Sequence, residues 1–179
     1  MGGCFIRIFK VIVIVTIICL LTACSYSEEL PEYIHQLAAD GESIDRMEEY
    51  EGDMITAVYA VGTKGESPRM VAQQAYARGF NDMIKVLVLI DISAGLTERI
   101  QILEHHETED YGGYVTEEWF LGRFVGKDAG TSLRLVKMAA QSKEEIVAIT
   151  GATYTSKAIV DAVNMCLANY RKIIEEVEL

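Results

Sequence analysis

The C-terminal part of the chain carries the pattern that most constrains the fold, an apolar stripe at helical spacing. Apolar residues recur three and four positions apart at Ile159, Val163, Cys166, Leu167, Tyr170, Ile174 and Val177. This spacing places them on one face of a helix, which must be buried against another element. Thr155 or Ser156 can cap the N-terminus of this helix by accepting a hydrogen bond from a free backbone N–H.

A turn of small residues stands directly before this helix, in the segment Ile149-Thr150-Gly151-Ala152-Thr153-Tyr154. Gly151 and Ala152 allow a bulky group to approach the backbone. The N-terminus of a helix offers unpaired N–H groups and a partial positive charge, which favour a phosphate. The Thr153 hydroxyl would lie close to that phosphate. The alternative is a helix-capping turn that holds no cofactor.

Strand patterns fill the middle of the chain. Met54 to Val61 and Leu96 to Leu103 alternate between apolar and polar residues, and Ile84 to Ile92 contains the continuous apolar run that is typical of a buried strand. Turns are expected at residues 63–68 and 93–95. The sequence therefore predicts an α+β fold, an antiparallel sheet flanked by helices in a single domain.

Two further segments are expected to be helical. Glu32 to Met47 looks helical in patches, with a break at Asp40-Gly41, and Val71 to Arg78 is expected to form a short helix. His105 to Gly130 is expected to be a long glycine-rich loop with a short helix near Glu117 to Phe120. Such a loop beside a hairpin is a candidate edge for a ligand site.

The N-terminus has the features of an export signal. Arg7 and Lys10 precede an uncharged run from Val11 to Ala23, and Leu21-Thr22-Ala23-Cys24 fits the lipobox of bacterial lipoproteins. Lipidation of Cys24 and an uncleaved transmembrane anchor are the two alternatives. Either one predicts that the rest of the chain is extracytoplasmic and held at a membrane. We expect a signal peptide or anchor over residues 1–23, a tether and helical segment over 24–53, and the folded domain over 54–179.

Charge and cysteine content limit the partners. Removing Arg7 and Lys10 from the 16 basic residues leaves 14 against 27 acidic ones, a net charge of −13. Such a surface repels nucleic-acid phosphates, so no nucleic-acid partner is expected. Cys166 is the one cysteine beyond the leader and Cys24, so no disulfide is expected within the domain, and its place on the apolar stripe predicts a core residue.

Three blocks, in order, resemble the FMN-binding domains of Rnf-type (G-type) and Nqr-type (C-type) subunits of electron-transport complexes and of related flavinylated lipoproteins. Thr150-Gly151-Ala152-Thr153-Tyr154-Thr155-Ser156 is similar to the family motif (Ser/Thr)-Gly-Ala-Thr-x-Thr-Ser. The segment from Gly79 to Val86 resembles the family's aromatic turn and following strand. The third block consists of Leu103 to Thr108 and Phe120 to Lys127.

The resemblance implies a function. In that family the threonine matching Thr153 carries FMN through a phosphoester, which a flavin transferase installs from FAD with Mg²⁺. The cofactor-binding residues implied here are Thr153, Thr150, Gly151, Ala152, Thr155, Ser156, Glu107 and Thr108. The chain is then expected to carry electrons between redox proteins, either as a subunit of such a complex or as a free-standing carrier lipoprotein.

The sequence departs from the family pattern at three places. Val147 stands where the family usually has Asp, three residues before the motif, and Glu109-Asp110-Tyr111-Gly112 replaces Pro-Gly-Leu-Gly. The lipobox differs from the single membrane helix that is typical of the Rnf G-type subunit. Val147 lies in the apolar run Ile146 to Ile149 and is expected to pack inward on a buried strand, where an unpaired charge would be costly.

The same residues also permit other interpretations. The FMN-binding domain of a catalytic reductase and a non-redox binding lipoprotein are the alternative functions. His105 and His106 could bind a metal with nearby carboxylates, although adjacent residues on a strand point to opposite faces, and no metal site is expected. Trp119 and Phe120 are expected to pack in the core rather than stack on flavin. No Ser-His-Asp or paired-carboxylate arrangement supports hydrolase chemistry.

Lipidation can be tested at Cys24. Because the thiol is the atom that receives the lipid, Cys24→Ala is expected to block processing at this position and to raise the mass of the chain recovered from the native host. Intact mass and membrane fractionation check this result. An unchanged mature mass and unchanged membrane retention in the variant would contradict lipidation.

Overall fold

The computed structural model describes residues 30–177, so the leader and Cys24 lie outside the described residues. The chain divides at Ile34 into two units, which are described separately. The first described helix, α2, covers Glu32–His35. Within residues 30–177, no helix combines the length and the apolar content that crossing a bilayer requires.

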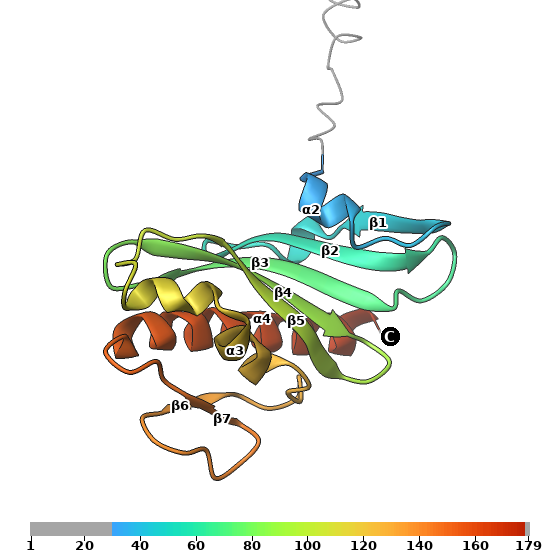
Figure 1. The fold of residues 1–179 in the computed structure, drawn as a ribbon. Helices are drawn as coiled ribbons and strands as arrows, with labels where there is room; N and C mark the ends of the chain where they lie inside the picture. Colours follow the sequence, from blue (N-terminus) through green and yellow to red (C-terminus); the bar gives the residue numbers. More distant parts are fainter. Residues whose placement is uncertain (1–29, 178–179) are drawn as a thin grey trace, which may run out of the picture. The chain divides into compact units, whose positions relative to one another are not determined.

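The larger unit is built on a five-stranded antiparallel sheet (Figure 1). Its strands follow one another in sequence order and are β1 (Glu42–Arg46), β2 (Ile55–Thr63), β3 (Met70–Arg78), β4 (Met83–Asp91) and β5 (Leu96–Glu104). The central pairing sets Val71 opposite Ile90, and Val88 opposite Ile100. The predicted strands over 54–61, 84–92 and 96–103 and the α+β class are confirmed.

Two predicted helical segments are strands instead. Residues 71–78 have a helix-favouring composition, Ala-Gln-Gln-Ala, but they form β3 because both edges of this segment pair with neighbouring strands. Residues 42–46 form the edge strand β1 and pair with β2. The break at Asp40-Gly41 is confirmed as a turn with Gly41 at a φ of 89°. The sheet therefore begins before residue 54.

Helix α4 (Thr153–Val177) lies along one face of the sheet and contacts β3 and β4 (Figure 1). Its stripe is buried from Ile159 to Tyr170, with Ile159, Val163 and Leu167 fully inaccessible, and Ile174 is partly buried. Cys166 is also buried, and burial raises the pKa of its thiol, as suits a small core residue. The Gln73 side chain of β3 donates to the Cys166 carbonyl over 2.9 Å, which fixes the helix on the sheet.

The chain from β5 to α4 is mostly short elements. They are η2 (Gly112–Thr116), α3 (Glu118–Leu121), η3 (Gly122–Phe124), β6 (Arg134–Val136) and β7 (Glu145–Val147). Phe120 and Phe124 are fully buried, whereas Trp119 is half exposed. The core role expected of Trp119 is therefore wrong, and that of Phe120 is confirmed. Strands β6 and β7 pair in parallel and lead the chain into the turn before α4.

Candidate functional site

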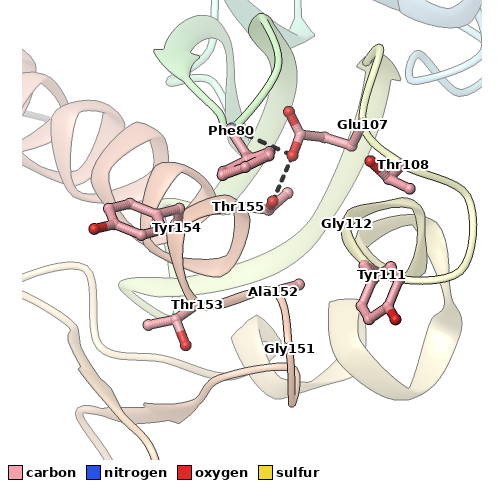
Figure 2. A pocket seen from close by; sticks show the side chains of 10 residues that line it. All are labelled: Phe80, Glu107, Thr108, Tyr111, Gly112, Gly151, Ala152, Thr153, Tyr154 and Thr155. Atoms are coloured by element: carbon pink, nitrogen blue, oxygen red, sulfur yellow. Dashed lines mark hydrogen bonds between the residues drawn. The ribbon is translucent and has the colours of Figure 1, made fainter.

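Three segments far apart in the sequence meet around one small cleft at the start of α4 (Figure 2). They are the β3–β4 turn, the loop after β5 and the turn into α4. The cleft has a volume of about 150 Å³ and is lined by Phe80, Glu107, Thr108, Tyr111, Gly112, Gly151, Ala152, Thr153, Tyr154 and Thr155. Each of the three sequence blocks that resemble the FMN-binding family thus contributes residues to the cleft, although the Phe120 to Lys127 part of the third block does not line it.

Glu107 holds the three segments in contact. Its carboxylate accepts hydrogen bonds from the backbone N–H of Asn81 over 2.9 Å and of Phe80 over 3.2 Å. The Thr155 hydroxyl donates to its Oε2 atom. Burial alone would raise the pKa of Glu107, but the hydrogen bonds from Thr155 and from the backbone of the β3–β4 turn outweigh it and lower that pKa. The carboxylate is therefore ionised and fully engaged at the floor of the cleft.

Gly112 is required by a close approach to this carboxylate. A Cβ atom at Gly112 would lie 2.7 Å from the Glu107 Cβ and 2.9 Å from the Thr155 Oγ1 atom. Any side chain at this position would push the loop away from α4. This explains structurally why the loop keeps Gly112 although its preceding residues depart from the family pattern.

The turn into α4 presents Thr153 at the rim of the cleft. Gly151 has a φ of 81°, which L side chains rarely adopt, and it turns the chain so that α4 begins at Thr153. Thr153 is half-buried, and Figure 2 shows its hydroxyl pointing away from Glu107. The hydroxyl therefore stands at the helix N-terminus, where backbone N–H groups favour an anion.

Thr155 and Ser156 lie inside the first turn of α4 and do not cap it, which corrects the predicted cap. The Ser156 hydroxyl donates to the Ala152 carbonyl over 2.8 Å and accepts from the Ile149 N–H over 3.0 Å. Ser156 is fully buried and does not line the cleft. It fixes the turn that carries Thr153, because it ties the residues before the turn to the helix.

Of the eight predicted cofactor-binding residues, six line the cleft and two do not, namely Thr150 and Ser156. The cleft also includes Phe80, Tyr111 and Tyr154, which the sequence did not assign as site residues. The sequence gives little reason to assign them to the site. Phe80 and Tyr154 lie within the segments that resemble the family, and Tyr111 stands at a departure from the family pattern. Among residues 30–177, no group of three or more His, Cys, Asp or Glu side chains could hold a metal ion.

Thr150 belongs to a second hollow. It is lined by Tyr114, Trp119, Arg123, Val147, Ala148, Ile149 and Thr150. Arg123 donates to the carbonyl of Val147, and its guanidinium lies 4.9 Å from the centre of the Trp119 ring. Val147 is half-buried, so the expectation that it packs inward on a buried strand is corrected. Val147 and Arg123 both line this hollow, so a carboxylate at position 147 would lie in a hollow that also holds a cation.

Comparison with known proteins agrees with this geometry. A family model described as the FMN-binding domain matches residues 79–168, which include every residue that lines the cleft. The G-type subunit of the Na⁺-translocating ferredoxin:NAD⁺ oxidoreductase complex of Acetobacterium woodii is 32% identical over 117 residues, covering 65% of this chain and 56% of that protein. The G-type subunit of the ion-translocating oxidoreductase complex of Methanosarcina acetivorans is 30% identical over 148 residues, covering 81% and 74%.

The fold also has solved relatives. The C-type subunit of the Na⁺-translocating NADH-quinone reductase from Parabacteroides distasonis superposes with a TM-score of 0.55 at 20% identity, over 65% of this chain and 61% of that one. A likeness at this identity concerns the fold alone. The chain spans little more than half the length of the Acetobacterium protein.

The role of Glu107 can be tested through pH. Because the folded-state pKa of Glu107 is lowered, its contribution to stability is present above the pKa of the unfolded chain and is lost as pH falls through the folded pKa. Glu107→Gln is expected to reduce the free energy of unfolding by about 1.5–3 kcal/mol at neutral pH. The difference from wild type should shrink in acid.

Urea unfolding across this pH range checks the prediction. Glu109→Gln is the matched control, because Glu109 is exposed in the same loop and does not line the cleft. A wild-type-like stability for Glu107→Gln at neutral pH would contradict a central role for this carboxylate.

Proposed function

The chain belongs to the FMN-binding domain family, and on that premise we propose that it carries electrons on an FMN joined to the Thr153 hydroxyl by a phosphoester. The observation that carries this proposal is the position of Thr153. It begins α4, lies next to the positive-φ turn at Gly151, and borders a cleft with apolar walls. The redox chemistry belongs to the flavin, and the protein positions and tunes it.

The residues around the cleft suit FMN in two ways. The phosphate would lie at the N-terminus of α4, on the side of Thr153 that faces away from the Glu107 carboxylate. The charge of Glu107 is compensated by three donors, Phe80 N–H, Asn81 N–H and the Thr155 hydroxyl. Like-charge repulsion between carboxylate and phosphate is therefore limited.

The covalent step would exchange the phosphoanhydride bond of FAD for a phosphoester bond to Thr153. The Thr153 Oγ1 atom forms a bond to the flavin-side phosphorus of FAD, and the bond from that phosphorus to the bridging oxygen breaks. AMP leaves with the electron pair of the broken bond, and the hydroxyl proton is released. A flavin transferase supplies the catalytic groups and Mg²⁺. No electron is transferred in this step, so the oxidation state of the flavin does not change.

The size of the cleft supports electron transfer by contact. A cleft of about 150 Å³ is smaller than the roughly 300–1,000 Å³ of sites that enclose a small molecule. Part of the flavin would remain at the surface, where a redox partner can approach it. A covalent bond would keep a cofactor that is held in so open a site from diffusing away.

We also propose where the carrier works. The export signal over residues 1–23 and Cys24 support a lipid or helix anchor at the extracytoplasmic face of a membrane, with the segment after Cys24 leading into the folded domain, whose sheet begins at Glu42. The relatives named as parts of oxidoreductase complexes support other redox proteins or complex subunits as partners. A free-standing carrier lipoprotein is the alternative arrangement.

Covalent attachment can be tested at the hydroxyl. Thr153→Ala is expected to abolish covalent flavin, because no nucleophilic oxygen remains, whereas Thr153→Ser is expected to retain some. Flavin fluorescence of the denatured protein on a gel, after co-expression with a flavin transferase, measures the bound cofactor. Thr150→Ala is the matched control, because Thr150 is exposed and lines the neighbouring hollow. Equal fluorescence from wild type and Thr153→Ala would contradict the assignment.

A second test concerns Val147. We expect wild type to receive FMN, and Val147→Asp to fold because Val147 is half-buried and lines the same hollow as the Arg123 guanidinium. Ile146→Asp is the contrasting control, because Ile146 is fully inaccessible and an unpaired charge there would cost several kcal/mol. Thermal unfolding measures the fold, and intact mass measures the flavinylated fraction.

The flavinylated fraction then decides between two roles for the family's Asp. Similar labelling of wild type and Val147→Asp is expected if that Asp is structural. Almost no labelling of wild type with strong labelling of Val147→Asp would contradict covalent FMN in the native chain. Non-covalent FMN or a non-redox lipoprotein would then explain the chain better.

A further inference from the structure

Three large aromatic side chains stand exposed around the cleft beside Thr153. Phe80, Tyr111 and Tyr154 are 66%, 56% and 73% exposed, and they come from the β3–β4 turn, the loop after β5 and α4. Exposed aromatic surface that gathers around one hollow marks a surface that a ligand or partner covers. The rings are therefore candidates for direct contact with a flat, partly apolar cofactor.

The rings stand on two sides of the cleft. Phe80 and Tyr154 contact each other, with ring centres 6.3 Å apart and planes inclined by 44°. Tyr111 packs on the turn, where its Cδ1 atom lies 3.0 Å from the position of a Cβ atom built on Gly151. Figure 2 shows Tyr111 on one side of Ala152 and Thr155, and Phe80 and Tyr154 on the other. The arrangement is a slot with aromatic walls.

The backbone of Tyr111 is held by hydrogen bonds within its loop. Its N–H donates to the Thr108 carbonyl over 3.1 Å, and the Gly113 N–H donates to the same carbonyl over 2.8 Å. The loop is anchored at its two ends by Glu107 and by the close approach of Gly112 to α4. A loop held in this way needs little further ordering of its backbone when a ligand stacks on Tyr111.

We propose that Tyr111 stacks its phenol ring on the flavin and tunes it, an inference that rests on the proposed function. The face of an aromatic ring is electronegative, so a stacked phenol disfavours the additional negative charge of the reduced flavin and lowers its reduction potential. The same contact quenches flavin emission, because the excited flavin takes one electron from the phenol and returns it, with no net change. Leucine, the residue of the family pattern at this position, has neither property.

The experiment uses the full chain co-expressed with a flavin transferase. The variants are Tyr111→Leu and Tyr111→Phe. Tyr114→Leu is the matched control, because Tyr114 lies in the same loop and is 41% exposed but lines the neighbouring hollow. Two quantities are measured at equal flavin content: the ratio of flavin emission in the unfolded and folded states, and the midpoint reduction potential.

Wild type and Tyr114→Leu are expected to emit weakly when folded and several-fold more strongly when unfolded. Tyr111→Leu should lower the ratio of unfolded to folded flavin emission several-fold, toward one. It should also raise the midpoint reduction potential. Tyr111→Phe should also restore emission, because phenylalanine does not donate an electron readily. Its potential should stay below that of Tyr111→Leu, because the ring face remains.

The outcomes separate the two proposals. Wild type that contains no bound flavin would overturn the proposed function and this inference with it. Wild type that contains flavin, together with an unchanged emission ratio and potential in Tyr111→Leu, would overturn the role of Tyr111 alone. Recovery of emission in Tyr154→Leu but not in Tyr111→Leu would assign the contact to the opposite wall and would also overturn it.

Discussion

The buried carboxylate of Glu107 is the interaction on which the site depends. A buried carboxylate is costly unless donors compensate its charge, and its three donors come from two segments that are distant in sequence, the β3–β4 turn and the start of α4. The loop after β5 contributes the carboxylate itself. The cleft is thus complete only when all three segments have docked, which couples the formation of the site to the tertiary fold.

The sheet and α4 provide the rigid frame for this contact. The apolar stripe of α4 fixes the helix on β3 and β4, and buried polar groups set its position along the sheet. The Asn169 side chain donates to the Gln73 side chain over 2.8 Å, and Gln73 donates to the Cys166 carbonyl. A hydroxyl at the first residue of such a helix is held in place by the whole core. This is the kind of support that a site with a fixed attachment point needs.

The periodicity of the sequence was enough to predict the elements whose burial is one-sided or complete. Strands β2, β4 and β5 and helix α4 followed from it, because their pattern reflects the face that they bury. Strand β3 did not, since its Ala and Gln residues favour a helix locally and only pairing with β2 and β4 makes it a strand. The edge strand β1 was also missed, because it becomes a strand only through pairing with β2, which lies further along the chain.

The candidate site was predictable to a similar extent. The motif gave Thr153, Gly151 and Ala152, because it describes one local turn. The same motif suggested Ser156 as a cofactor contact or cap, but the structure uses its hydroxyl inside the turn. The walls at Phe80 and Tyr154 could not be predicted from spacing, because they meet only through the docking of the β3–β4 turn on Glu107.

The loop after β5 shows which contacts a sequence pattern does not reveal. Backbone hydrogen bonds to the Thr108 carbonyl and the space at Gly112 define its path, and neither depends on the side chains of Glu109, Asp110 and Tyr111. The side chain at position 111 can therefore vary while these backbone contacts of the loop are kept.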